Sequence, residues 1–323
     1  MKRYPLKLVG IPKSAIWGGS RLKTEYKKTA DFDPIAESWE LSVRDGAVNT
    51  VANGEGAGLP LSVCFEKMGL SSVLPDYDGA DFPLLVKLID AASPLSVQVH
   101  PDDGYAKSHG GGNGKTETWV VIDAEPGAEL VMGLADGVGR AEFSIAVGEK
   151  KFDGVMKRVP VKPGDVFFIP SGMLHAIGGG ILIAEVQQNC DVTYRVWDYD
   201  RRDKDGNLRP LHIREALDVV RPFSDGECDA LRFAGGAALL PGETLVNCRY
   251  FEVSRLSVAK KAPLALPADR FTHLLILDGS PRVSGGGETV CCRAGDSVFF
   301  PAGTDAPTLE GNGTVLLSCP REK

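Results

Sequence analysis

The segment Pro163–Gly172 reads PGDVFFIPSG, and 131 residues further on Ala294–Gly303 reads AGDSVFFPAG. Each contains Gly-Asp, four mostly apolar residues and then Pro-x-Gly. This order predicts a turn, a buried strand and a second turn. Because the pattern returns far along the chain, it indicates a duplicated β module. We therefore expect two β domains.

Short apolar runs bounded by Gly, Pro, Asn or Asp continue on both sides of these segments. Runs rich in Val, Ile and Phe predict the strands of a sandwich or barrel. Helical periodicity is confined to Leu59–Leu70 and to Leu211–Arg221, which lies between Pro210 and Pro222. The expected fold class is therefore mainly β with a few helices. The predicted strands include Leu95–Val99, Thr118–Ile122, Asp165–Ile169, Ile181–Val186, Phe251–Val258, Thr272–Leu277, Ser297–Phe300 and Thr314–Leu317.

The composition is that of an ordinary globular chain. Its 323 residues are 43% hydrophobic and 24% charged, which suffices for a core without disulfide or metal staples. The net charge of −7 argues against nucleic acid or an anionic membrane as the main partner. The chain contains no apolar run of signal-peptide or membrane-span character, and its seven cysteines form no CxxC pair. We expect a cytoplasmic protein, monomer or homodimer, without a membrane or nucleic-acid partner.

The predicted boundary between the two domains lies around residues 222–240, where Ser, Asp, Gly and Ala dominate. We expect a larger domain over residues 1–225 and a smaller one over residues 240–323. The two copies differ at one position. His175 stands three residues after the final glycine of the first segment, whereas Ala306 stands three after that of the second. If His175 takes part in chemistry, the second domain has lost that function and is structural.

The strand Leu95–His100 places polar and apolar side chains alternately. Gln98 and His100 are two residues apart and therefore share a face, while Val97 and Val99 point to the other face. A strand of this kind either lines a polar cavity or faces solvent.

Further polar residues follow on neighbouring predicted strands. Lys115, Glu117 and Trp119 share a face, and His175 begins another strand. Each histidine could instead pack in the core, and the strand with Gln98 could be a solvated sheet face. Imidazole nitrogen, carboxylate oxygen and carboxamide oxygen are, however, ligands that suit zinc and its first-row neighbours. The residue types thus predict a candidate metal site made of Gln98, His100, Glu117 and His175.

Seven segments of the sequence resemble those of a known protein family. They occur in the order found in that family and cover roughly residues 5–215. The chain resembles the bacterial class of type I mannose-6-phosphate isomerases, which belong to the cupin superfamily. The resemblance implies a cupin-type β-barrel or jelly roll for the first domain. The last hundred residues resemble the family only through the Gly-Asp…Pro-x-Gly segment, and with Ala306 in place of the histidine we expect a smaller, degenerate cupin-like domain without a metal site there. Trp197 departs from the pattern, which usually has Tyr there. The segments are Ile16–Gly19, Glu37–Ser42, Pro83–Asp90, Leu95–Asp103, Gly114–Trp119, Pro163–His175 and Thr193–Arg201.

The resemblance also implies an activity and a set of site residues. The activity would be the zinc-dependent interconversion of mannose 6-phosphate and fructose 6-phosphate through an enediol intermediate. The catalytic domain would hold one Zn²⁺, and the partner would be a small sugar phosphate. The implied residues are the zinc ligands His100, Glu117 and His175, the additional ligand Gln98, the active-site arginine Arg195, and the pocket lysines Lys87 and Lys115.

The proton transfer in such a reaction requires a general acid–base group. Glu185 and Lys87 are both candidates, and the sequence does not choose between them. Arg195 would stabilise a developing oxyanion or hold the phosphate. Structural roles compete with these assignments, because Glu185 could belong to an ordinary ion pair and Arg195 could pair with Asp198 or Asp200.

Two other functions compete with the isomerase. A cupin iron or manganese oxygenase also uses His and carboxylate ligands around an open metal position. A non-catalytic sugar-phosphate-binding protein would keep a decayed site, but His100, Glu117, His175 and Arg195 are all intact. Metal content and the oxygen dependence of turnover would separate the oxygenase from the isomerase.

Overall fold

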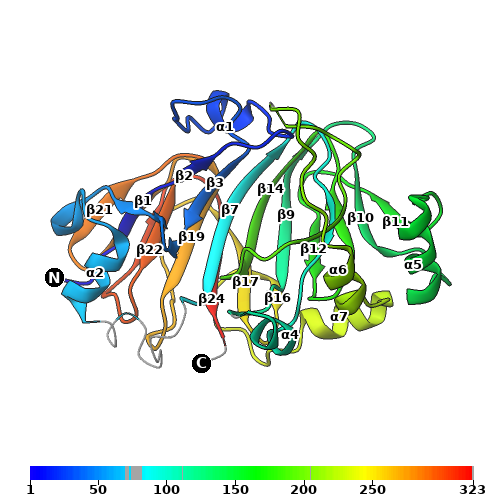
Figure 1. Ribbon diagram of the computed structural model, residues 1–323. Helices are drawn as coiled ribbons and strands as arrows, with labels where there is room; N and C mark the ends of the chain where they lie inside the picture. The colour runs from blue at the N-terminus through cyan, green and yellow to red at the C-terminus, as the bar shows by residue number, and fades with distance from the viewer. Residues whose placement is uncertain (70–72, 74–81, 111, 204, 322–323) are drawn as a thin grey trace.

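The computed structural model describes residues 1–69, 73, 82–110, 112–203 and 205–321 (Figure 1). Four antiparallel β-sheets dominate this part of the chain, and they form two modules of two sheets each. The mainly β fold predicted from the sequence is confirmed. Among the described residues, no helix is both long enough and apolar enough to cross a membrane.

The first module pairs a six-stranded sheet, in the order β12-β9-β14-β7-β3-β2, with a five-stranded sheet, in the order β11-β10-β13-β8-β15. Its strands are β2 (Ile11–Lys13), β3 (Glu37–Leu41), β7 (Leu84–Ala91), β8 (Val97–Val99), β9 (Glu117–Ala124), β10 (Glu129–Leu134), β11 (Met156–Pro160), β12 (Val166–Ile169), β13 (His175–Ile177), β14 (Ile181–Gln188) and β15 (Tyr194–Trp197). A separate two-stranded sheet joins β4 (Val43–Arg44) and β5 (Ala47–Val48).

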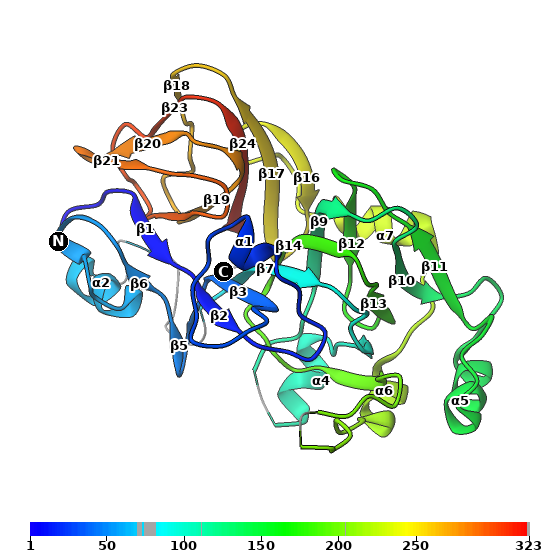
Figure 2. The ribbon, with the colours of Figure 1, turned by 90° about the horizontal axis from the view of Figure 1, so that it is seen from above.

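The second module pairs a seven-stranded sheet, β16-β17-β24-β19-β22-β1-β6, with a four-stranded sheet, β18-β23-β20-β21. Two strands from the N-terminal part of the chain therefore complete a sheet of the second module. Figure 2 shows blue β1 beside the orange strands. The strands are β1 (Leu6–Val9), β6 (Thr50–Val51), β16 (Glu243–Asn247), β17 (Phe251–Val258), β18 (Ala262–Pro263), β19 (Thr272–Gly279), β20 (Arg282–Gly285), β21 (Glu288–Cys291), β22 (Ser297–Phe300), β23 (Thr308–Glu310) and β24 (Gly313–Pro320).

The sequence repeat corresponds to the same local structure in both modules. Gly164 and Gly295, which open the two segments, have φ values of +91° and +84°. Gly172 and Gly303, which close them, have φ values of +87° and +65°. Glycine adopts this left-handed region without the steric cost of a Cβ atom. The strand between the glycines is β12 in the first module and β22 in the second.

The two large sheets pack against each other and are buried on both faces. In β7, Leu84, Val86 and Leu88 belong to the core shared with the second module, where they join residues such as Phe251 and Phe299. The residues between them face the interior of the first module. This alternation explains why β7 is almost wholly apolar, as expected for a strand covered on both sides.

The helices lie at the margins of the sheets. The two predicted helices are present as α2 (Leu61–Met68) and α6 (Ile213–Val219), while the predicted end at Leu70 lies outside the described residues. Several other helices were not predicted from the sequence. The expected linker contains α7, which begins after Ser224, whose side chain accepts a hydrogen bond from Glu227 N. Because α7 is only eight residues long and rich in charged residues, it shows no long apolar periodicity in the sequence. The unpredicted helices are α1 (Arg21–Thr24), η1 (Gly54–Gly56), α4 (Asp103–Ser108), α5 (Arg140–Glu149) and α7 (Asp225–Arg232).

Candidate metal centre and active site

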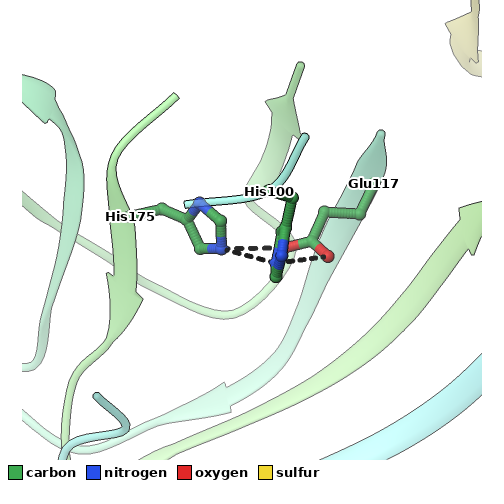
Figure 3. A group of neighbouring side chains, drawn as sticks. All are labelled: His100, Glu117 and His175. Atoms are coloured by element: carbon green, nitrogen blue, oxygen red, sulfur yellow. Dashed lines mark hydrogen bonds and ion pairs between the residues drawn. The ribbon is translucent and has the colours of Figure 1, made fainter. Parts of the chain in front are cut away.

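Three predicted metal ligands meet inside the first module (Figure 3). His100 follows β8, Glu117 begins β9 and His175 begins β13. Their candidate ligand atoms all lie within 4.8 Å of one another. His175 Nε2 is 3.3 Å from Glu117 Oε1 and 3.2 Å from His100 Nε2. All three side chains are buried, so they form a compact group shielded from bulk water.

Backbone carbonyls fix the tautomer of both imidazoles. His100 Nδ1 lies 2.8 Å from Val192 O, and His175 Nδ1 lies 2.8 Å from Met173 O. A carbonyl can only accept, so each Nδ1 carries the proton and each Nε2 presents a lone pair to the cluster. Burial lowers the pKa of both rings, that of His175 to about 4, so both are neutral at physiological pH. Two imidazole lone pairs facing a carboxylate suit a cation.

The charge of Glu117 also fits a cation site. Neither of its oxygens has a hydrogen-bond partner of good geometry among the described residues, although both are buried. Burial raises the pKa of Glu117, and Lys115, whose Nζ lies 2.7 Å from Oε2, opposes this rise. The same Nζ is 3.0 Å from His100 Nε2. A buried carboxylate beside two neutral imidazoles is the donor set that Zn²⁺ commonly takes.

Gln98 lies next to the cluster. Its backbone pairs with that of His175 across β8 and β13, and its Nε2 is 3.4 Å from His175 Nε2. Its Oε1 lies 3.3 Å from the Ser96 hydroxyl. For Gln98 to ligate a metal through oxygen, its amide would have to rotate by about half a turn. Val97 and Val99, on the other face of β8, pack in an apolar cluster, as the strand pattern predicted.

Lys87 and Glu185 form a buried ion pair on adjacent strands of the six-stranded sheet. Lys87 Nζ is 3.0 Å from Glu185 Oε1, and Trp119 Nε1 donates to Glu185 Oε2 at 2.9 Å. Burial lowers the pKa of Lys87, but Glu185 and Glu37 raise it more, so it lies above its usual value. Burial raises the pKa of Glu185, but Lys87 and Lys115 lower it to about 2. At neutral pH the lysine is therefore protonated and the glutamate ionised.

The sequence analysis did not identify the two β3 residues that lie beside this ion pair, Glu37 and Trp39. Trp39 on β3 is directly opposite Lys87 on β7, and its Nε1 donates to Glu37 Oε2 at 2.8 Å. Lys87 Nζ is 3.9 Å from the same Glu37 oxygen, and Lys13 Nζ lies 4.6 Å from the Trp39 ring centroid. The alternation of Glu37 and Trp39 was the available signal, but the strand register that brings them to Lys87 cannot be read from sequence.

Arg195 is the cross-strand neighbour of Gln98, on β15 and β8. Its Nη1 donates to Pro210 O at 3.0 Å, and its buried Nε has no hydrogen-bond partner among the described residues. Asp198 instead pairs with Arg201 and Arg209, so the expected alternative pairing with Asp198 is not observed. Burial lowers the pKa of Arg195, yet an arginine stays charged at neutral pH. The guanidinium keeps a donor available.

A hydrogen-bonded chain connects the second module to the strand of Glu117. Tyr250 donates to Asp103 Oδ2 at 3.0 Å, and Gln188 Nε2 donates to Asp103 Oδ1 at 3.1 Å. Gln188 Oε1 in turn accepts from Thr116 N at 2.8 Å. Thr116 lies between Lys115 and Glu117. No sequence signal revealed this contact, because its members are far apart along the chain.

The chain is similar to known proteins over nearly its full length. Residues 6–137 match the family model "Phosphomannose isomerase type I, catalytic domain", and residues 242–320 match "Mannose-6-phosphate isomerase, cupin domain". The mannose-6-phosphate isomerase ManA of Bacillus subtilis is 35% identical over 98% of this chain and 99% of its own. The mannose-6-phosphate isomerase of Streptococcus mutans is 34% identical, with 97% and 98% covered. A crystal structure of the mannose 6-phosphate isomerase from Bacillus subtilis superposes with a TM-score of 0.87 at 32% identity, covering 98% of this chain and 99% of that one.

Proposed function

Since the chain belongs to the type I mannose-6-phosphate isomerase family, we propose that it interconverts mannose 6-phosphate and fructose 6-phosphate in the first module. The observation that carries this proposal is the convergence of two neutral imidazoles, a buried carboxylate and an ionised Lys87–Glu185 pair. Isomerisation moves a proton between C1 and C2 of the sugar through an enediol. It therefore requires a carbonyl-polarising group and an acid–base group.

His100, Glu117 and His175 would hold one Zn²⁺, with Gln98 as an additional ligand. Zinc with an open coordination position supplies Lewis-acid polarisation of a carbonyl oxygen. The support is the donor set itself, two Nε2 lone pairs and the buried carboxylate of Glu117. The Nδ1–carbonyl contacts keep both rings oriented for this role.

Glu185 is the proposed proton acceptor of the reaction. Its carboxylate is ionised, whereas Lys87 is held protonated by the same ion pair. A protonated amine cannot remove a proton, so we assign Lys87 the role of proton donor and of electrostatic partner to the Glu185 carboxylate. The hydrogen bond from Trp119 keeps the carboxylate oriented.

Lys115 and Arg195 would bind the anionic substrate. Both are cationic and lie beside the ligand cluster, Lys115 through contacts to Glu117 and His100, and Arg195 through its neighbour Gln98. The buried Nε of Arg195 is free to donate to a phosphate or to a developing oxyanion. A local cationic group can thus hold an anion on a protein of net charge −7.

A coupled assay of fructose 6-phosphate formation from mannose 6-phosphate tests the proposal. The assay is run before chelation, after chelation and after zinc is restored, and zinc is measured in each sample. We expect activity to follow zinc content. Full turnover in zinc-free protein would refute the metal role, and binding of mannose 6-phosphate without conversion would refute the isomerase.

A further inference from the structure

Lys115, one of the two cations proposed to bind the substrate, follows a glycine-rich stretch of sequence. Residues 109–114 read HGGGNG, and glycine loses more backbone freedom on folding than any other residue. The backbone of Lys115 therefore needs anchors of its own. Its ammonium lies inside the site, with Nζ 2.7 Å from Glu117 Oε2 and 3.0 Å from His100 Nε2. A small shift of the backbone would move this charge away from the ligand cluster.

The residues on both sides of Lys115 are held by one carboxylate oxygen. Gly114 N donates to Asp103 Oδ1 at 2.7 Å. Thr116 N donates to Gln188 Oε1 at 2.8 Å, and Gln188 Nε2 donates to the same Asp103 oxygen at 3.1 Å. The position of this oxygen thus sets the course of the backbone that carries Lys115.

The two segments are in direct backbone contact where this anchor acts. A Cβ atom added to Gly114 would lie 2.5 Å from Asp102 C and from Asp103 N, so only glycine allows this approach. Gln188 is buried, and its partners assign both ends of its amide, because a backbone N–H can only donate and a carboxylate can only accept. The network therefore has a single hydrogen-bonding arrangement.

The second module reaches this anchor through Tyr250, which lies between β16 and β17. Its hydroxyl donates to Asp103 Oδ2 at 3.0 Å. Its carbonyl accepts from Arg321 N at 2.9 Å, which ties its backbone to the residue after β24. With Gly114 and Gln188 on one oxygen and Tyr250 on the other, the carboxylate is held from both sides. Hydrogen bonds to a carboxylate are about twice as strong as those between neutral groups, so each of them contributes to this orientation.

We propose that Asp103 and Tyr250 are positioning residues for Lys115, and that the second module thereby acts on the affinity of the site for an anionic sugar phosphate. Neither residue touches the substrate in this role. The Tyr250 hydroxyl fixes the Asp103 carboxylate, the carboxylate fixes the backbone of residues 114–116, and that backbone places the ammonium of Lys115. The inference rests on the substrate-binding role proposed for Lys115.

Calorimetric titration of the zinc-loaded protein with mannitol 1-phosphate tests this coupling. The analogue carries the phosphate but has no carbonyl group, so it cannot be isomerised. We expect Asp103→Ala to weaken its binding about tenfold and Tyr250→Phe about threefold, with zinc content unchanged. Asp103→Asn should stay within about twofold of the parent, because its carbonyl oxygen can still accept from Gly114 and Gln188 while its amide nitrogen donates to Tyr250.

Tyr105→Phe is the matched control. It removes the same hydroxyl from a tyrosine of α4 whose partner is Asp218 at 3.2 Å, outside the network, and it should bind the analogue as the parent does. The double variant Tyr250→Phe with Asp103→Ala should bind no more weakly than Asp103→Ala alone, since the hydroxyl acts through that carboxylate. Additive losses in the double variant, or equal affinity in Tyr250→Phe and the parent, would overturn the proposal.

Amide hydrogen exchange separates this inference from the proposed function. Exchange in the peptide around Lys115, measured by mass spectrometry, should be faster in Tyr250→Phe than in the parent and unchanged in Tyr105→Phe. A parent protein that does not bind mannitol 1-phosphate would refute the substrate-binding role of Lys115. Unchanged exchange in Tyr250→Phe would refute the positioning role of Tyr250, whatever the activity of the enzyme.

Discussion

Replacement of Glu185 by Gln tests the buried ion pair and the acid–base assignment together. Glutamine is nearly isosteric, and its Oε1 can still accept from Trp119 Nε1, which lies 2.9 Å from the glutamate. What changes is the charge facing Lys87. The remaining carboxylate near Lys87 Nζ, that of Glu37, is 3.9 Å away, compared with 3.0 Å for Glu185.

Loss of the Glu185 charge leaves the buried ammonium group of Lys87 with the more distant carboxylate of Glu37 as its ion-pair partner. Removing one member of a buried pair costs about 3–5 kcal/mol, because the other charge stays desolvated. We expect the free energy of unfolding of Glu185→Gln, measured in urea at neutral pH, to fall by about that amount. Lys87→Met combined with Glu185→Gln removes both charges and should be clearly more stable than Glu185→Gln alone. A cost below about 1 kcal/mol, or a double variant no more stable than the single one, would refute the pairing.

The stability difference should depend on pH in a defined direction. Lys87 and Lys115 hold the pKa of Glu185 at about 2, below its ordinary 4.5. A depressed folded-state pKa stabilises the fold above the unfolded pKa, and this contribution disappears as the pH falls from 4.5 toward 2. The gap between parent and Glu185→Gln should therefore be constant near neutrality and shrink below pH 4.5. A gap that grows with acidity would contradict the assignment.

The same variant bears on catalysis. If Glu185 accepts the proton, kcat should fall by about 10²–10⁴-fold. Zinc measured in the same sample shows whether the metal centre is intact. A variant that keeps zinc and retains kcat within tenfold of the parent would exclude Glu185 as the proton acceptor.

Four further substitutions address the rest of the site. Glu117→Ala and His175→Ala should each lose zinc and activity while unfolding stays cooperative; elemental analysis checks this, and full zinc occupancy in His175→Ala would contradict the ligand set. Arg195→Ala should keep zinc and lose most of kcat in the coupled assay, whereas a change confined to KM would limit Arg195 to phosphate binding. Asp103→Ala removes the acceptor for Gln188 and should lower kcat several-fold with zinc retained. A kcat equal to that of the parent would show that this contact does not position the strand of Glu117.

Local chemistry made much of the fold predictable. The turns of the two Gly-Asp…Pro-x-Gly segments could be predicted from the sequence, because Gly164 and Gly295 occupy left-handed backbone that other residues avoid. The two-residue spacing of Gln98 and His100 placed both toward one interior, because side chains alternate along a strand. The helix α7 was not predicted because it is only eight residues long and rich in charged residues.

Long-range pairing accounts for what the sequence could not show. The contact of Trp39 with Lys87 depends on the register of β3 against β7, and the chain from Tyr250 to Asp103 depends on how the modules meet. The addition of β1 to the sheet of the second module is of the same kind. Local propensity carries no information on any of these. The division into residues 1–225 and 240–323 stays a prediction of domain organisation, although the seven-stranded sheet of the second module also contains β1 and β6 from the N-terminal part of the chain.

The alternation along β7 and β14 indicates a structural role for the second module. Lys87 and Glu185 face the site, whereas their neighbours Val86, Ala184 and Val186 lie in the core shared with the second module. The backbone that carries the ion pair is therefore held in place from behind by the second module. Without that module, the outer face of the six-stranded sheet would expose its apolar residues to water. The second module thus acts on the site through packing, and substitutions in the shared core should disturb the ion pair without touching it.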